Sequence, residues 1–180
     1  MRQSFAEQLG IQLARQQRRI VLAESCTGGM AAALLTQVPG ISNWFCGSAV
    51  TYRQTTKRQW LGIATETIGQ FTAESLPTTE EMAVRVLEKT PEADLSGAIT
   101  GHLGPGVDLS IDGVVFISIA RRIRRLPNLK VEETPIQTIH SQSHRLQASS
   151  RTDRQMEAAE LLLAKLEAHL RIEDYSSKPE

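Results

Sequence analysis

The chain has 180 residues, of which 41% are hydrophobic, and its 20 basic side chains balance its 20 acidic ones. This size and apolar content suit one compact domain with a buried core, and a net charge of zero argues against broad nucleic-acid binding, which depends on neutralising phosphates. The two cysteines, Cys26 and Cys46, form no CxxC pair and are too few for a disulfide framework, so we expect a reduced, cytoplasmic protein.

Helical and strand patterns alternate along the chain. The polar, amphipathic start has no signal-peptide core, and no run of about 18 apolar residues occurs, so neither a signal peptide nor a membrane contact is expected. Pro77 followed by Glu80-Glu81 marks a well-defined helix start. In chain order we predict a helix at 2–17, a strand at 20–23, a helix at about 27–37, a turn or short helix at 42–45, a strand at 47–52, short helices at 55–61 and from 65, a helix at 77–89, strands at 95–100, 113–120 and 130–139, and a helix at 151–170.

The order of these elements indicates the fold class. Strands and helices alternate early, and two adjacent strands and a long helix follow. This order favours a three-layer α/β/α sandwich with a mixed sheet. We expect a single domain over residues 1–172, followed by a flexible tail at 173–180.

Three polar or glycine-rich turns each follow a predicted strand, at residues 24–29, 51–57 and 100–106. In open α/β sheets, binding sites lie beyond the carboxyl ends of the strands. If the three strands are parallel neighbours, their turns converge. The sequence then predicts one site at this edge of the sheet.

The first turn carries the most distinctive motif, Glu24-Ser25-Cys26-Thr27-Gly28-Gly29, between a strand and a helix. A helix N-terminus leaves its first N–H groups unpaired and carries partial positive charge, so it can receive an anion or a developing oxyanion. This makes Ser25 a candidate nucleophile and the glycines candidate cradle residues. The competing interpretation is ordinary capping, because Ser and Thr are common N-caps and Gly is common in such turns.

A serine nucleophile needs a base, and the other two turns each offer one candidate. Lys57 can act as the base if it is partly desolvated or near another cation, so that its amine is neutral. The alternative is an exposed lysine on a short helix. His102 is either a second candidate base or a packing or solvent residue. Cys26 could replace Ser25 as the nucleophile, or be a buried structural thiol.

Other polar clusters point to no cofactor. The sequence has no HExxH motif and no metal-ligand spacing of His, Cys and Asp, so no metal is expected. The glycine loop fits neither GxGxxG nor a Walker motif, so no nucleotide cofactor is expected. Asp108 and Asp112, which flank the third turn, are expected to be solvated. The basic run 121–125 predicts a solvated strand end or, alternatively, a patch that binds phosphate or a partner.

Taken in order, the motifs resemble a known family. The first turn matches the family's opening motif without a mismatch, and a Val-Thr-Tyr segment, a lysine and a glycine loop follow in the same order. The matching segments are Ala23–Gly29, Val38–Ser42, Val50–Tyr52 with Lys57, Leu61–Ile63, Ala93–Leu95, Ala98–Gly101 and Gly104–Gly106. The chain is similar to the C-terminal domain of the competence/damage-inducible protein CinA, a family that includes stand-alone nicotinamide-nucleotide amidases.

The resemblance implies hydrolysis of the carboxamide of nicotinamide mononucleotide, which gives nicotinate mononucleotide and ammonia. It implies that Ser25 is the nucleophile and Lys57 its base, with no cofactor, and that the protein is a homodimer. We expect the N-terminal pyrophosphatase-like domain of long family members to be absent from 180 residues. The residues expected to bind the substrate or its oxyanion are Thr27, Gly28, Gly29, Tyr52, Thr100, Gly101 and Gly104.

The chain departs from the family pattern at three places. Arg53-Gln54 replaces Ser-Asn, His102-Leu103 replaces Ile-Ala, and residues 107–113 form a shortened loop that lacks the family's lysine. Pocket walls set substrate specificity, so two further hypotheses stay open. One is a related amidase with a different substrate, and the other is a non-catalytic member that binds a nucleotide or a protein partner.

Overall fold

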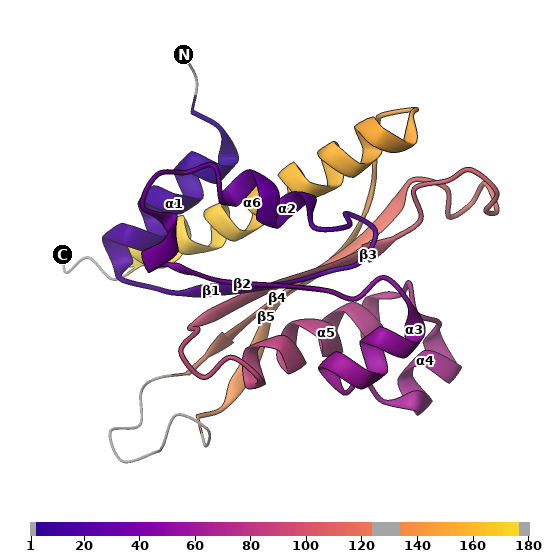
Figure 1. Cartoon of the computed structure of the whole chain (residues 1–180), viewed down its shortest axis with the longest axis horizontal. Coiled ribbons are helices and arrows are strands. Elements are labelled where there is room, and N and C mark those ends of the chain that lie inside the picture. The colour runs from indigo at the N-terminus through magenta and orange to yellow at the C-terminus, as the bar shows by residue number, and fades with distance from the viewer. Residues whose placement is uncertain (1–2, 124–133, 177–180) are drawn as a thin grey trace.

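A five-stranded mixed sheet forms the centre of the protein. The computed structural model describes residues 3–123 and 134–176. The strand order is β2-β1-β3-β4-β5, in which β1 is parallel to β2 and β3, and β4 is antiparallel to β3 and β5 (Figure 1). The strands are β1 (Ile20–Glu24), β2 (Phe45–Val50), β3 (Leu95–Gly101), β4 (Val114–Arg122) and β5 (Ile136–Arg145).

Helices cover both faces of the sheet, which confirms the predicted α/β/α arrangement. In Figure 1, α1, α2 and α6 lie on one face, and α3, α4 and α5 lie on the other. Each face has its own apolar core, one containing Leu35 and Leu162 and the other Met82 and Val86. Within the described part of the chain, no helix is both long and apolar enough to cross a membrane. The helices are α1 (Phe5–Gln16), α2 (Met30–Leu35), η1 (Ile41–Asn43), α3 (Gln54–Thr56), the π-helical turn η2 (Lys57–Leu61), α4 (Thr65–Phe71), α5 (Leu76–Glu88) and α6 (Arg151–Ser176).

The central strand β1 brings the three predicted turns together. All its residues are buried, and it lies between β2 and β3. Because the three strands are parallel, their carboxyl ends meet at one edge of the sheet. Two backbone hydrogen bonds hold the turns at this edge: Ser25 N–H donates to the carbonyl of Ile99 in β3 at 3.1 Å, and Thr51 N–H donates to the Glu24 carbonyl at 2.8 Å. The predicted convergence is therefore confirmed.

Local signals determine where the first two helices begin. Ser4 and Glu7 form a reciprocal capping box at the start of α1. The second helix begins at Met30, later than the predicted start near residue 27. Gly28 and Gly29 have φ angles of 63° and 98°, a left-handed conformation that glycine adopts without steric cost and that cannot continue a right-handed helix.

The last strand differs from the prediction of 130–139. It spans Ile136–Arg145, and residues 130–133 lie outside the described residues. Its second half, from His140 onward, is polar and shows no apolar alternation that would mark a strand. The strand lies at an edge of the sheet and is only partly buried, so polar side chains are tolerated there.

The basic run also differs from the predicted solvated strand end. Arg122 is buried, and its guanidinium donates to the carbonyl oxygens of Leu87, Thr90 and Ala93 at and beyond the end of α5. These bonds satisfy carbonyl groups and place a cation near the negative end of the helix. Residues 124 and 125 lie outside the described residues.

The C-terminal helix packs along the first helix of the chain. Gln16 Nε2 donates to the Leu170 carbonyl oxygen at 2.8 Å. Residues 173–176 of the expected tail belong to this helix, and 177–180 lie outside the described residues. The division into one domain over 1–172 and a flexible tail stays a prediction.

Candidate active site

Ser25 and Lys57 are in direct contact where the turns converge. Ser25 follows the last residue of β1 and is buried, and Lys57 begins η2 with no exposed surface. Lys57 Nζ lies 2.8 Å from Ser25 Oγ and 3.1 Å from the carbonyl oxygen of Thr51. The first distance falls within the range of about 2.6–3.2 Å over which a base can take a proton from a hydroxyl. The structure thus brings the predicted nucleophile and base together.

Burial governs the charge state of Lys57. Desolvation lowers the pKa of the Lys57 amine, while the charge of Glu74 opposes this effect. Both hydrogen-bond partners of the amine are neutral oxygens. A lowered pKa increases the neutral fraction of the amine, which is the form that accepts a proton. The alternative of a solvent-exposed lysine is wrong.

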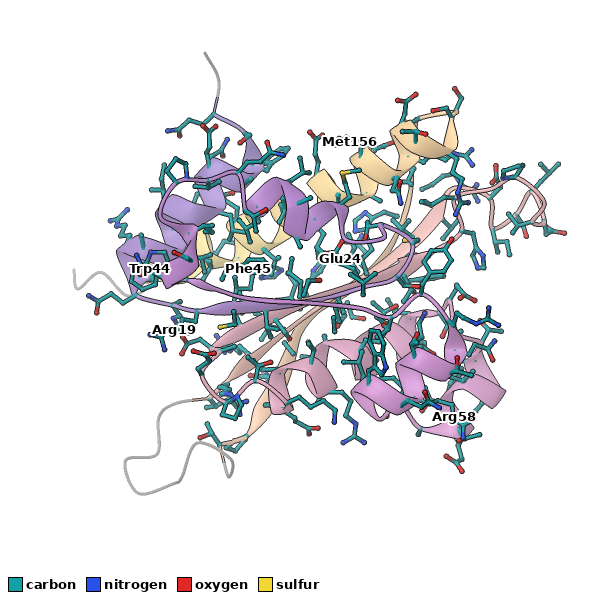
Figure 2. The ribbon with its side chains drawn as sticks, in the orientation of Figure 1. Arg19, Glu24, Trp44, Phe45, Arg58 and Met156 are labelled. Carbon is teal, nitrogen blue, oxygen red and sulfur yellow. The ribbon has the colours of Figure 1, made fainter. Side chains whose placement is uncertain are left out.

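Glu24 caps α2 with a fully buried carboxylate. Oε2 accepts hydrogen bonds from Thr27 Oγ1 at 2.8 Å and Ala31 N–H at 3.0 Å. Oε1 accepts from Ala32 N–H at 3.0 Å and Ser48 Oγ at 2.9 Å. Figure 2 shows Glu24 on the side of the sheet that α2 covers. The Glu24 carboxylate therefore already accepts hydrogen bonds from N–H groups at the N-terminus of α2, where we expected an anion to bind.

A cavity of about 190 Å³ lies beside Ser25. It joins residues from all three turns, from the segment before α5 and from the start of α6. A larger hollow of about 400 Å³ near Arg58, labelled in Figure 2, contains neither Ser25 nor Lys57, so size alone does not locate the site. The cavity beside the serine is lined by Ser25, Cys26, Tyr52, Glu74, Gly101, His102, Leu103, Gly104, Pro105, Val107 and Arg151.

Of the predicted binding residues, Tyr52, Gly101 and Gly104 line this cavity and Thr100 does not. The Thr100 hydroxyl is buried 2.7 Å from Thr79 Oγ1 on α5. Successive residues of a strand point to opposite faces, so a residue within a matching motif can still point away from the site.

The glycine turn after Ser25 does not line the cavity either. Thr27 is buried with its hydroxyl on Glu24, and Gly28 N–H donates to the Ser25 carbonyl at 3.0 Å. Gly29 is the N-cap of α2. In the described structure these three residues shape the turn that carries the serine, and their contact with a substrate stays a prediction.

Two charged residues of the lining, Arg151 and Glu74, were not predicted from the sequence. Arg151 is the first residue of α6, and its guanidinium donates to Tyr52 Oη at 2.9 Å and to the carbonyl oxygen of Gly104. Neither residue lies in a recognisable motif. One signal exists for Arg151: β5 runs in the same direction as β3, so the segment after β5 reaches the same edge of the sheet.

The other candidates for nucleophile and base are less well placed. Burial raises the pKa of Cys26 to about 12, so its thiol stays protonated at neutral pH. His102 lines the cavity, but Lys57 is the residue that holds the Ser25 hydroxyl. Among the residues that the structure describes, no group of three His, Cys, Asp or Glu side chains could hold a metal ion.

Asp112 was expected to be solvated, but it is only partly exposed. It forms a two-pronged ion pair with Arg154 of α6, at 2.7 and 3.0 Å, and this hydrogen bonding lowers the pKa of Asp112. Gly104 has a φ of 61°, and a Cβ there would lie 2.5 Å from Asp112 Oδ1, so this turn requires glycine. The ion pair holds the third turn against the helix that supplies Arg151. Asp108 is exposed, as predicted.

Comparisons with known sequences agree with the resemblance found from the motifs. The sequence model of the CinA C-terminal domain matches residues 2–162. The nicotinamide-nucleotide amidohydrolase PncC of Escherichia coli strain K12 is 40% identical over 118 residues, which cover 64% of this chain and 71% of that protein. A CinA-like protein of Gloeothece citriformis is 39% identical over 126 residues, 69% of this chain and 29% of the relative. The chain therefore spans less than a third of the length of such relatives.

Solved structures share the fold. The competence/damage inducible protein CihA from Agrobacterium tumefaciens has a TM-score of 0.77 and 26% identity, with 95% of this chain and 98% of that chain covered. A CinA superfamily protein from Klebsiella pneumoniae 700603 also has a TM-score of 0.77, with 24% identity and 93% and 96% covered. The match of the family model to residues 2–162 shows that the chain belongs to the CinA C-terminal domain family.

Proposed function

We propose that the chain is an amidohydrolase that converts nicotinamide mononucleotide to nicotinate mononucleotide and ammonia. The observation that carries this proposal is the buried contact of Lys57 Nζ with Ser25 Oγ at 2.8 Å, beside a cavity. The similarity to the E. coli nicotinamide-nucleotide amidohydrolase supports the choice of substrate. Amide hydrolysis needs an activated nucleophile, a proton donor for the leaving nitrogen and a partner for the developing oxyanion.

The Ser25–Lys57 pair can carry both halves of the reaction. Neutral Lys57 accepts the Ser25 proton as Oγ attacks the carboxamide carbon, and it then donates that proton to the departing nitrogen. Ammonia leaves, and an ester joins the nicotinoyl group to Ser25. Water attacks the ester while Lys57 takes up a proton from it. Lys57 returns that proton to Ser25 Oγ as the ester C–O bond breaks. The acid product leaves as its carboxylate, and the proton it loses passes to solvent or to the released ammonia.

Arg151 is the residue we assign to the substrate phosphate. Because the N–H groups at the start of α2 already donate to Glu24, the positive charge that binds the phosphate has to come from a side chain of the cavity lining. A guanidinium is a planar donor suited to phosphate oxygens. Its bonds to Tyr52 and Gly104 hold it in the lining, so these two predicted binding residues position the arginine.

The test is ammonia release from nicotinamide mononucleotide, with chromatography of the product. Ser25→Ala should abolish turnover, and Lys57→Met should lower kcat by about 10²–10⁴-fold, the usual contribution of a general base. Ser42→Ala and Lys89→Met, at exposed positions, are the matched controls and should retain activity. A folded wild-type protein that releases no ammonia at high enzyme concentration would refute the proposed function.

A related amidase with another substrate is the second candidate. Leu103 lies at a departure from the family pattern, and it lines the cavity with Pro105 and Val107. A panel of simple amides and nucleotide amides distinguishes the two functions, because Ser25 is required in both while the preferred substrate differs. The cytoplasmic location and the homodimer stay predictions.

A further inference from the structure

Glu74 is a carboxylate in the lining of the same cavity, and the reaction steps above do not use it. Together with Arg151 it gives the cavity charges of both signs. Nicotinamide mononucleotide has the same character, because its pyridinium ring is cationic and its phosphate is anionic. We propose that Glu74 selects substrates whose ring bears positive charge, by lying beside that ring when the carboxamide is at Ser25. This inference rests on the proposed function and adds the basis of its specificity.

The backbone around Glu74 is held on both sides. Ala73 is fully buried, and Ser75 is the N-cap of α5. The carbonyl oxygen of Thr72 accepts hydrogen bonds from Ser75 Oγ at 3.1 Å and from Thr78 Oγ1 at 2.6 Å. These contacts fix the connection between α4 and α5, so Glu74 is presented to the cavity from a well-anchored turn.

Among the residues that the structure describes, the Glu74 carboxylate has no partner that would explain its position. Within the described residues, its side chain forms no hydrogen bond and no ion pair at 4.0 Å or less, and it is only partly exposed. The Glu24 carboxylate differs, since four donors of the protein satisfy it. An unpaired carboxylate facing a cavity is free to meet a cation that enters it.

The charge of Glu74 reaches the reacting atoms. It is the principal charge that raises the pKa of Lys57 against the effect of burial. Its field therefore acts at the place where the carboxamide, which is attached to the ring, meets Ser25. Interactions between charges weaken with distance and with solvent. A cationic ring bound in the same small cavity is close to Glu74 and shielded from solvent, so it experiences the field of that carboxylate.

Two roles of Glu74 have to be separated, an effect on Lys57 and an effect on the substrate ring. The discriminating pair of substrates is nicotinamide mononucleotide and its reduced form, whose dihydropyridine ring is neutral and whose carboxamide, ribose and phosphate are the same. In Glu74→Gln, KM for the cationic substrate should rise about tenfold, equivalent to about 1.4 kcal/mol. KM for the reduced form should change less than about twofold. Glu66→Gln, an exposed glutamate of α4, is the matched control.

The pH profile reports the effect on Lys57 separately. Because Glu74 raises the pKa of Lys57, Glu74→Gln should shift the rise of kcat with pH to lower pH for both substrates equally. A change in KM that is equal for the two substrates, or no change for either, would overturn the inference while leaving the proposed reaction intact.

Binding measurements keep the inference testable if turnover is absent. Calorimetry with Ser25→Ala and with the double variant Ser25→Ala/Glu74→Gln gives Kd for both nucleotides without hydrolysis. Loss of about tenfold in affinity for the cationic form alone supports the role of Glu74, even if the wild type proves inactive and the proposed function fails. Equal affinities for the two forms in Ser25→Ala, or binding of neither, would overturn it.

Discussion

Replacement of Glu24 by Gln tests whether the buried carboxylate stabilises the turn that carries Ser25. The carboxylate accepts four hydrogen bonds, and in either orientation one side-chain oxygen becomes an NH₂ group. That group then faces the N–H of Ala31 or of Ala32, and neither can turn round to accept. A buried donor left unpaired costs about 1–3 kcal/mol, and loss of the charge at the helix N-terminus adds about 0.3–1 kcal/mol.

The expected loss in the free energy of unfolding is therefore about 1.3–4 kcal/mol, measured by urea denaturation followed by circular dichroism. For a domain of this size it corresponds to a fall in Tm of roughly 3–15 °C. Ser48→Ala is the matched control, because it removes one hydroxyl donor to the same carboxylate and should cost only about 0.5–1.5 kcal/mol. If Glu24→Gln proves no less stable than Ser48→Ala, the carboxylate does not hold this turn in the way described.

Three further outcomes follow from the structure. Activity should rise with pH and level off below the ordinary lysine pKa of about 10.4, because burial lowers the pKa of Lys57 and only its neutral form is a base; a pH–rate profile without this plateau would contradict the assignment. Burial, with a contribution from the charge of His169, lowers the pKa of His140 to about 4 in the folded state. Between about pH 4 and 6.5 the unfolded state therefore binds more protons than the folded state, and the free energy of unfolding should fall as the pH decreases through that window. The loss from this group is about 1–2 kcal/mol after allowance for its partial exposure, and urea denaturation at pH 7 and pH 4.5 should show a smaller loss in His140→Gln than in the wild type. Gly97→Ala should cost about 1–3 kcal/mol in the same assay, since its Cβ would lie 2.9 Å from Leu166 Cδ1; a neutral effect would mean that this layer is loosely packed.

The sequence predicted those parts of the fold and site that have local signals. Alternation of strand and helix patterns indicated the layers, and the turns after β1, β2 and β3 converge because those strands are parallel. Ser25 and Lys57 could be predicted to meet because each lies in a segment that follows one of these strands, Ser25 directly after β1 and Lys57 a few residues after β2. The bounds of β5 were wrong because an edge strand needs little apolar alternation, and its polar half resembles a loop.

Arg151 and Glu74 were not predicted, since each reaches the cavity from a segment without a motif, and only the direction of β5 points to Arg151. Their roles depend on where α5 and α6 begin relative to the site, which is a property of the tertiary structure. Thr100 shows the opposite error. Its motif is in the right turn, but the alternation of side chains along β3 directs its hydroxyl to Thr79 instead of the cavity.

The same alternation places the helix cap and the proposed catalytic serine of the first turn on different faces of the sheet. Along β1, Ile20 and Leu22 face the core under α2 and α6, whereas Val21 and Ala23 face the core under α5. Glu24 continues the first series and caps α2. The next residue continues the second series and meets Lys57, which lies with α3 and α5 on the other face. Two adjacent residues thus lie on opposite sides of the sheet, Glu24 as the cap of α2 and Ser25 as the proposed nucleophile. A one-residue shift in the register of β1 would move both side chains to the opposite face, where Glu24 could not cap α2 and the Ser25 hydroxyl could not meet Lys57.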